Sequence, residues 1–181
     1  MTGKIQPGDY KIVPLAERHC QGVMEIFNFY ITESYAAFPD KPVPEAFFHR
    51  FLEMSKGYPA LAVMTDDNVV GFSFLRPYHW AETFGRTAEI TYFLRPEHTR
   101  RGLGAALLES LCQQAGQQGI EVIVASLSSR NLASLAFHLK NGFEICGTLK
   151  KVGKKFGQDF DVVLMQKQIT RNEVCLEKRT T

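Results

Sequence analysis

The chain has 181 residues, of which 45% are hydrophobic and 22% charged, and its formal net charge is +2. These values are ordinary for one globular domain with its own core, and the balance of charge gives no reason to expect nucleic acid or an anionic membrane surface as a partner. No apolar run reaches the roughly 18 residues of a membrane span, and the first residues lack the apolar centre of a secretion signal. Four scattered cysteines indicate reduced thiols in a cytoplasmic protein and no metal site.

Hydrophobic periodicity predicts one strand, two helices, three strands, and then alternating helices and strands. The expected strands are 10–15, a pair within 58–78 around the turn at 66–68, 86–94, 120–127, 143–152 and 159–169, and the expected helices are 16–30, 45–54, 102–119 and 131–141. This order predicts a mixed α/β sheet with helices on both faces. One domain is expected over 10–169, preceded by an extension at 1–9 and followed by a polar tail at 170–181.

The stretch LRPEHTRRGLGAALLESL, residues 94–111, joins a strand directly to an amphipathic helix. A helix start offers free N–H groups and the positive end of a dipole, so this turn is a candidate anion site. It lacks the third glycine of a dinucleotide fingerprint and the GK[ST] of a phosphate loop. A tight strand–helix turn with no ligand is the alternative interpretation.

Together, EITYFLRPEHTRRGLGAALLESL and the later SRNLASLAFHLKNGFE resemble the GCN5-related N-acetyltransferases (GNAT), and most closely their branch of phosphinothricin and amino-acid N-acetyltransferases. ITESYAAF, GRTAEITYFL and VGKKFGQDFDVVLMQ extend the resemblance over nearly the whole chain. The resemblance implies the GNAT fold, with a mixed, mostly antiparallel sheet of about seven strands and about four helices. It also implies acetyl-CoA as co-substrate, no metal, a small primary amine as acceptor, and a homodimer.

In this family the pyrophosphate of acetyl-CoA lies on the glycine loop and the pantetheine arm pairs with the preceding strand. The residues that the resemblance assigns to acetyl-CoA are Tyr92, Phe93, Leu94, Arg100, Arg101, Gly102, Leu103, Gly104, Ala105 and Asn131. Thr99 stands where the family usually has Gln or Arg, a position that contributes a backbone group. Asn131 is equally well explained as a helix N-cap.

The resemblance also implies two catalytic residues. Glu89 interrupts an otherwise apolar strand and would accept a proton from the acceptor amine, which reacts only when it is neutral. His138 occupies a place where many members of the wider family have Tyr, and it would exchange a proton with the acceptor or with coenzyme A, or would hold the acceptor. An ion-paired sheet glutamate and an ordinary hydrogen-bonded helix histidine are the alternatives.

An amino-acid-like acceptor needs cations and aromatic walls, and the candidates are Tyr35, Phe38, Arg76 and Arg86. For Arg76 a solvated loop charge is the competing interpretation. In the late hairpin, Asp159 stands where the branch often has Trp, which weakens any assignment to phosphinothricin or methionine sulfoximine. The lysines of this hairpin, Lys150, Lys151, Lys154 and Lys155, are expected to form a solvated turn, and a contact with a negatively charged acceptor is the less favoured alternative.

Three other functions compete with transfer to a small amine. A peptide or protein amine could be the acceptor, although the aromatic loops do not favour a wide groove. A non-catalytic acyl-CoA-sensing module would keep the loop but lose the acid–base pair, and this chain has both Glu89 and His138. A nucleotide or phosphate binder would need a recognition element that the sequence does not contain.

Overall fold

The computed structural model describes residues 10–169, and the predicted extension at 1–9 and tail at 170–181 lie outside the described residues. The helices are α1 (Cys20–Glu33), α2 (Phe48–Met54), α3 (Leu103–Gln117) and α4 (Leu132–Lys140). The strands are β1 (Lys11–Pro14), β2 (Ala60–Thr65), β3 (Asn68–Pro77), β4 (Thr87–Leu94), β5 (Val122–Ser128), β6 (Glu144–Lys155) and β7 (Gln158–Gln168). The predicted order of elements is confirmed. Helix α1 begins later than predicted because residues 17–19 form a 3-10 turn.

All seven strands form one sheet in the order β1-β2-β3-β4-β5-β7-β6. Every neighbouring pair is antiparallel except β4 and β5, which run parallel. The sheet is therefore mixed and mostly antiparallel, as predicted. None of the helices in the described part of the chain is long and apolar enough to cross a membrane.

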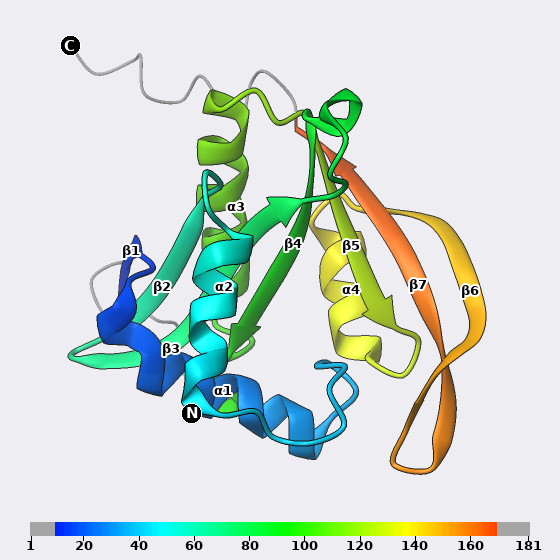
Figure 1. Ribbon diagram of the computed structural model, residues 1–181, viewed down its shortest axis with the longest axis horizontal. Coiled ribbons are helices and arrows are strands. Elements are labelled where there is room, and N and C mark those ends of the chain that lie inside the picture. Colours follow the sequence, from blue (N-terminus) through cyan, green and yellow to red (C-terminus); the bar gives the residue numbers. More distant parts are fainter. Residues whose placement is uncertain (1–9, 170–181) are drawn as a thin grey trace.

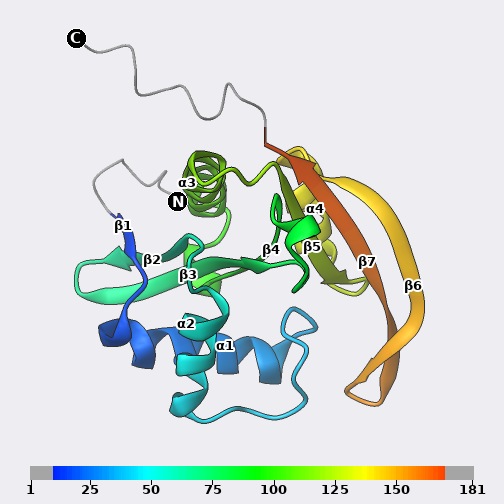
Figure 2. The same ribbon diagram turned by 45° about the horizontal axis from the view of Figure 1, so that its top comes forward.

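The helices cover the two faces of the sheet in pairs, with α1 and α2 on one face and α3 and α4 on the other (Figure 2). Each face has its own core, because side chains alternate along a strand. On β4, Ile90 and Leu94 belong to the core beneath α3, whereas Phe93 packs against the aromatic core beneath α1 and α2. The same alternation divides β3, where Phe72 and Phe74 face α1 and α2 and Leu75 faces α3.

Strands β4 and β5 separate soon after they pair. Their shared register covers only Thr87–Glu89 of β4, although β4 continues to Leu94 and β5 to Ser128. Figure 1 shows the two strands diverging toward their C-terminal ends. Helix α4 begins shortly after β5, and α3 begins after a turn that contains the 3-10 segment Pro96–His98. The opening between the strands therefore leads from Glu89 toward the two helix starts.

Candidate active site

The turn before α3 has the backbone of an anion site. Arg100 has φ 59° and Gly102 has φ 91°, both in the left-handed region. Gly102 is the N-cap of α3 and has no capping side chain, so no side chain of its own occupies the first N–H groups of the helix. Left-handed residues in a turn direct successive N–H groups into one concave surface, which suits a phosphate. Arg100 and Arg101 are exposed beside it.

One contact places α4 close to this turn, and a cap fixes the start of α4. A Cβ on Gly104 would lie 3.1 Å from the ring of Phe137, so a larger residue would require that ring to move by a few tenths of an ångström. Asn131 caps α4, its side-chain oxygen accepting from the N–H of Ser134 at 3.2 Å. The N-cap interpretation of Asn131 is thereby confirmed, and its contact with acetyl-CoA stays a prediction.

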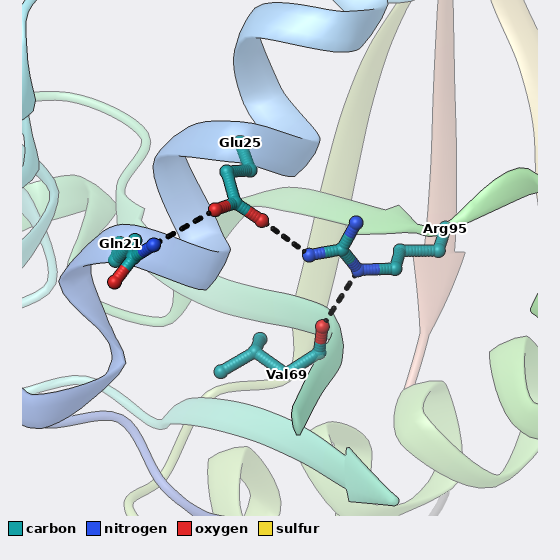
Figure 3. A network of polar contacts seen from close by, with 4 residues as sticks. All are labelled: Gln21, Glu25, Val69 and Arg95. Carbon is teal, nitrogen blue, oxygen red and sulfur yellow. Dashed lines mark hydrogen bonds and ion pairs between the residues drawn. The ribbon is translucent and has the colours of Figure 1, made fainter. Parts of the chain in front are cut away.

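Arg95 fixes the chain where β4 passes into the turn (Figure 3). Its Nε donates to the carbonyl of Val69 at 2.9 Å, and its Nη2 lies 2.6 Å from the Glu25 carboxylate, which Gln21 also contacts. The hydrogen bond from Arg95 holds the pKa of the Glu25 carboxyl below its usual value. The Arg95 guanidinium thus joins the start of the turn to Val69 on β3 and to Glu25 on α1, and it has a structural role.

Glu89 lies at the end of the paired segment of β4 and forms an ion pair with Arg76. The two residues are register partners on β4 and β3, and Arg76 Nη2 lies 2.8 Å from Glu89 Oε2. Alternation along both strands places them on the face that carries α1 and α2. The side chain of Glu89 is 16% exposed and that of Arg76 is 35% exposed. The expectation of Arg76 as a free loop charge is wrong, because the end of β3 brings it to Glu89.

His138 is enclosed on the opposite face, and its side chain has no exposed surface. Its Nδ1 lies 2.8 Å from the carbonyl of Ser134, which can only accept, so Nδ1 carries the proton. Nε2 is then free to accept from the hydroxyl of Tyr92 at 3.2 Å, and the ring of Phe143 packs edge-on at 4.7 Å. Burial lowers the pKa of His138, opposed by the Ser134 hydrogen bond, and burial also raises the pKa of Tyr92.

The aromatic candidates lie at the far end of the sheet. Tyr35 and Phe38 both pack on Phe160 of β7, with ring centroids 5.8 and 5.9 Å apart. Along β7, Phe160 is six residues away from the row that contains Glu89, roughly 20 Å along the strand. The loop after α1 is therefore attached to the β6–β7 hairpin, and its aromatic rings do not surround Glu89.

Lys155 makes that attachment, and sequence analysis missed it. Only 2% of this residue is exposed, and its ammonium donates to the carbonyls of Ser34 and Ala37 at 2.7 Å each. The expectation of a solvated lysine turn is wrong at this position, because the hairpin folds back over the loop. A lysine next to Phe156 in a stretch of other lysines gives little sequence signal of burial.

Arg86 lies at the start of β4. Its Nη1 is 3.2 Å from Glu121, and its side chain is 69% exposed. The backbone carbonyl of Arg86 accepts from the N–H groups of Glu121 and Val122, which joins the beginnings of β4 and β5. The structure thus brings Arg76 and Glu89 together, encloses His138 with Tyr92, and leaves Arg86 paired at the surface.

Comparison with known proteins identifies the family. The model of the acetyltransferase (GNAT) family matches residues 23–143. The L-methionine sulfoximine/L-methionine sulfone acetyltransferase of Pseudomonas aeruginosa is 34% identical over 149 residues, covering 80% of this chain and 86% of the relative. The structure of yncA from Salmonella typhimurium with its cofactor acetyl-CoA superimposes with a TM-score of 0.83 at 28% identity, over 90% of this chain and 95% of that one.

A third likeness is to the ribosomal-protein-alanine N-acetyltransferase of Brucella melitensis, with a TM-score of 0.82 and 31% identity over 87% of this chain and 99% of that one. The predicted fold and family are confirmed by these matches together with the seven-stranded sheet and four helices. The chain belongs to the GNAT acetyltransferase family and is an acetyl-CoA-dependent N-acetyltransferase.

Proposed function

We propose that this enzyme transfers the acetyl group of acetyl-CoA directly to the primary amine of a small amino-acid-like acceptor, of the phosphinothricin or methionine sulfoximine type. The observation that carries the proposal is the position of Glu89, which lies where β4 and β5 separate and beside the cation of Arg76. The likeness to the Pseudomonas aeruginosa acetyltransferase, whose name gives methionine sulfoximine and sulfone as acceptors, supports the same acceptor class.

Acetyl-CoA would lie along the opening between β4 and β5. The backbone of the turn, Arg100, Arg101, Gly102, Leu103, Gly104 and Ala105, would hold its pyrophosphate, since these N–H groups precede or begin α3. The arm would run along the backbone of Tyr92, Phe93 and Leu94, where β4 no longer pairs with β5, and Asn131 would meet it from α4. A backbone N–H of this strand segment would stabilise the negative charge that develops on the thioester oxygen.

Glu89 is the proposed general base. The α-ammonium group of an amino acid has a pKa near 8 and must lose a proton before its nitrogen can attack. Glu89 accepts that proton, the nitrogen bonds to the acetyl carbon, and the carbon–sulfur bond breaks. Coenzyme A leaves with the sulfur electron pair and takes up the second proton that the attacking nitrogen loses, which gives the thiol and the amide. No acyl-enzyme is required.

We propose His138 as a positioning residue that acts through Tyr92. The imidazole is enclosed and is hydrogen-bonded to Tyr92 and Ser134, so its link to the opening passes through the phenol on β4. By holding Tyr92, it holds the strand segment along which acetyl-CoA would lie.

Arg76 is the proposed contact for the acceptor's acidic group, and Arg86 adds a second positive charge at the same end of β4. Tyr35 and Phe38 lie on the attached loop, remote from Glu89, so only an acceptor much longer than an amino acid would reach both Glu89 and these rings. Asp159, which replaces the Trp of the branch, pairs with Lys154 across the hairpin, and its carbonyl accepts from Arg130.

We also propose a homodimer formed through the outer strand β6. This edge strand exposes four large apolar side chains, more than an isolated edge normally tolerates. They are Ile145, Leu149, Val152 and, just beyond the strand, Phe156. Light scattering after size exclusion tests this, and a monomer at micromolar concentration would contradict it.

The function is tested by release of coenzyme A thiol from acetyl-CoA in the presence of an amine panel. The panel contains the proteinogenic amino acids, phosphinothricin, methionine sulfoximine, methionine sulfone, polyamines and short peptides. Turnover restricted to amino-acid-like amines is expected. Preference for peptides would instead favour a protein or peptide acceptor, the class that the Brucella melitensis protein's name describes.

A further inference from the structure

Two arginines of the α1/α2 side differ in how completely they are bonded. Arg95 uses Nε on a backbone carbonyl and Nη2 on Glu25. Arg76 uses Nη2 on Glu89, but its Nε–H is enclosed and has no hydrogen-bond partner. A guanidinium carries five N–H donors in a planar fork, and an enclosed donor without a partner is costly. Arg76 is therefore not at its most favourable arrangement in the free enzyme.

The ion pair also lies in a row with few other charges. Along the register, Glu89 is followed by the uncharged Val124 on β5 and Gln166 on β7, and the next charged residue in the row is Glu144 on the outer strand β6. The pair lies at the narrow end of the opening between β4 and β5, and a third of the Arg76 side chain is exposed. A ligand that reaches Glu89 thus meets one negative and one positive group, side by side.

We propose that the Arg76–Glu89 ion pair exchanges partners when the acceptor binds, and that this exchange selects zwitterions. The acceptor's carboxylate takes the guanidinium of Arg76, and its ammonium takes the carboxylate of Glu89. One ion pair is replaced by two, and the planar fork of Arg76 gains a second set of acceptors. The exchange also places the ammonium on the proposed base. This inference rests on the proposed function and identifies its acceptors as amines with an adjacent anionic group.

A cationic amine without an acidic group would be a poor acceptor for the same reason. It would pair with Glu89 only by displacing Arg76, which would leave a partly buried cation without its partner. Polyamines, amino-acid amides and peptide N-termini fall in this class. The selectivity therefore comes from the penalty of an unpaired Arg76 as well as from the attraction between Arg76 and the acceptor's carboxylate.

The test compares one acceptor with its carboxamide, for example L-methionine sulfone and L-methionine sulfone amide. The wild type should prefer the acid in kcat/KM by about 10- to 100-fold, the range expected for a hydrogen-bonded charge pair. Arg76→Gln should lower kcat/KM for the acid by a similar factor, mainly through KM, and should raise kcat/KM for the amide, because the penalty of an unpaired Arg76 is removed. Arg76→Lys, which keeps the charge without the fork, should retain part of the preference.

Arg50→Gln on α2 is the matched control, because Arg50 lies over Phe47 and contacts neither Glu89 nor Arg76. Circular-dichroism melts and acetyl-CoA affinity show whether each variant is folded. Equal turnover of acid and amide by the wild type, or equal loss of both in Arg76→Gln, would overturn the exchange while the proposed function stands. No turnover of any amine by the wild type would overturn the proposed function itself, and this inference with it.

Discussion

Strand β4 carries a polar pair on each face, and the two pairs are built differently. On the α3/α4 face, His138 and Tyr92 bond to each other, and His138 also bonds to the Ser134 carbonyl inside an aromatic enclosure. On the α1/α2 face, Arg76 and Glu89 are partly exposed, and one enclosed donor of Arg76 has no partner. We call the first the closed pair and the second the open pair.

The difference between the pairs indicates that one stabilises the fold around the site and that the other can bind a ligand. Polar groups that are enclosed and fully bonded stabilise one arrangement, because any change leaves a group unsatisfied in a low-dielectric interior. Polar groups that are exposed and incompletely bonded can take a ligand with little rearrangement. Both pairs come from residues that resemble catalytic or acceptor positions of the family, yet only the open pair can meet an acceptor without unfolding its surroundings.

The largest effect should follow a change in the open pair that leaves its shape intact. Glu89→Gln keeps the size of the side chain but removes the base, and we expect kcat/KM to fall by about 10²- to 10⁴-fold. The free energy of unfolding should also fall, by about 1–2 kcal/mol, because the partly buried Arg76 loses its charged partner. The thiol-release assay measures the first effect and a thermal melt the second, with Glu53→Gln on the exposed side of α2 as the control. Retention of more than a third of the activity would contradict a base at Glu89.

The closed pair should respond in the opposite way. His138→Ala leaves a cavity beside Phe143 and removes the acceptor of the Tyr92 hydroxyl, so we expect a loss of about 2–4 kcal/mol in the free energy of unfolding. Urea denaturation measures this loss. The control is Leu139→Ala, because Leu139 is the neighbouring residue and is half-exposed. A loss below about 1 kcal/mol is expected for it.

A second His138 variant separates positioning from proton transfer. If His138 acts through Tyr92, a folded His138→Phe variant should show a raised KM for acetyl-CoA and an unchanged preference for acid over amide. A selective loss of kcat with normal KM and normal stability would show instead that the imidazole exchanges a proton with the substrates, and the closed pair would not be merely a support.

The attachment by Lys155 resembles the closed pair, since its ammonium is enclosed and holds the loop after α1. Lys155→Met should cost about 2 kcal/mol of unfolding free energy, because two carbonyls lose a charged donor. KM for a small acceptor should change little, because the loop that Lys155 holds is remote from Glu89. Lys154→Met, one residue earlier and exposed, is the control. Equal stability of the two variants would contradict the attachment.

Sequence patterns were sufficient wherever the information was local. The strand–turn–helix at residues 94–111, the cap at Asn131 and the order of elements each follow from neighbouring residues, and the structure confirms them. The pairing of Arg76 with Glu89 depends on the register between β3 and β4, which are joined by a nine-residue connection rather than a tight hairpin. No local pattern specifies that register.

Helix α4 shows how a pattern can mislead. Apolar residues are not always the buried ones here, since Leu132 is 72% exposed and Leu139 is 51% exposed, while His138 is enclosed. The imidazole can be buried because the Ser134 carbonyl and the Tyr92 hydroxyl satisfy both of its nitrogens, and those partners are visible only in three dimensions. Sequence analysis could place His138 on a helix near the loop but could not decide which way it faces.

The smallest effect we predict is a pH dependence that originates in the closed pair. Burial lowers the pKa of His138 in the folded protein, and also that of His19, below the value of about 6.5 of the unfolded chain. Below about pH 6.5 the unfolded state therefore binds more protons than the folded state. The free energy of unfolding has its full value above about pH 6.5 and falls as the pH is lowered below it. Urea midpoints between pH 7.5 and 5 measure the slope, and this window lies above the titration of Glu25 and Asp161, whose pKa values are lowered by hydrogen bonds. His138→Phe should reduce the slope and leave the share of His19. An unchanged slope would mean that His138 is protonated without penalty, and the pair on this face of β4 would then be as open as the pair on the other.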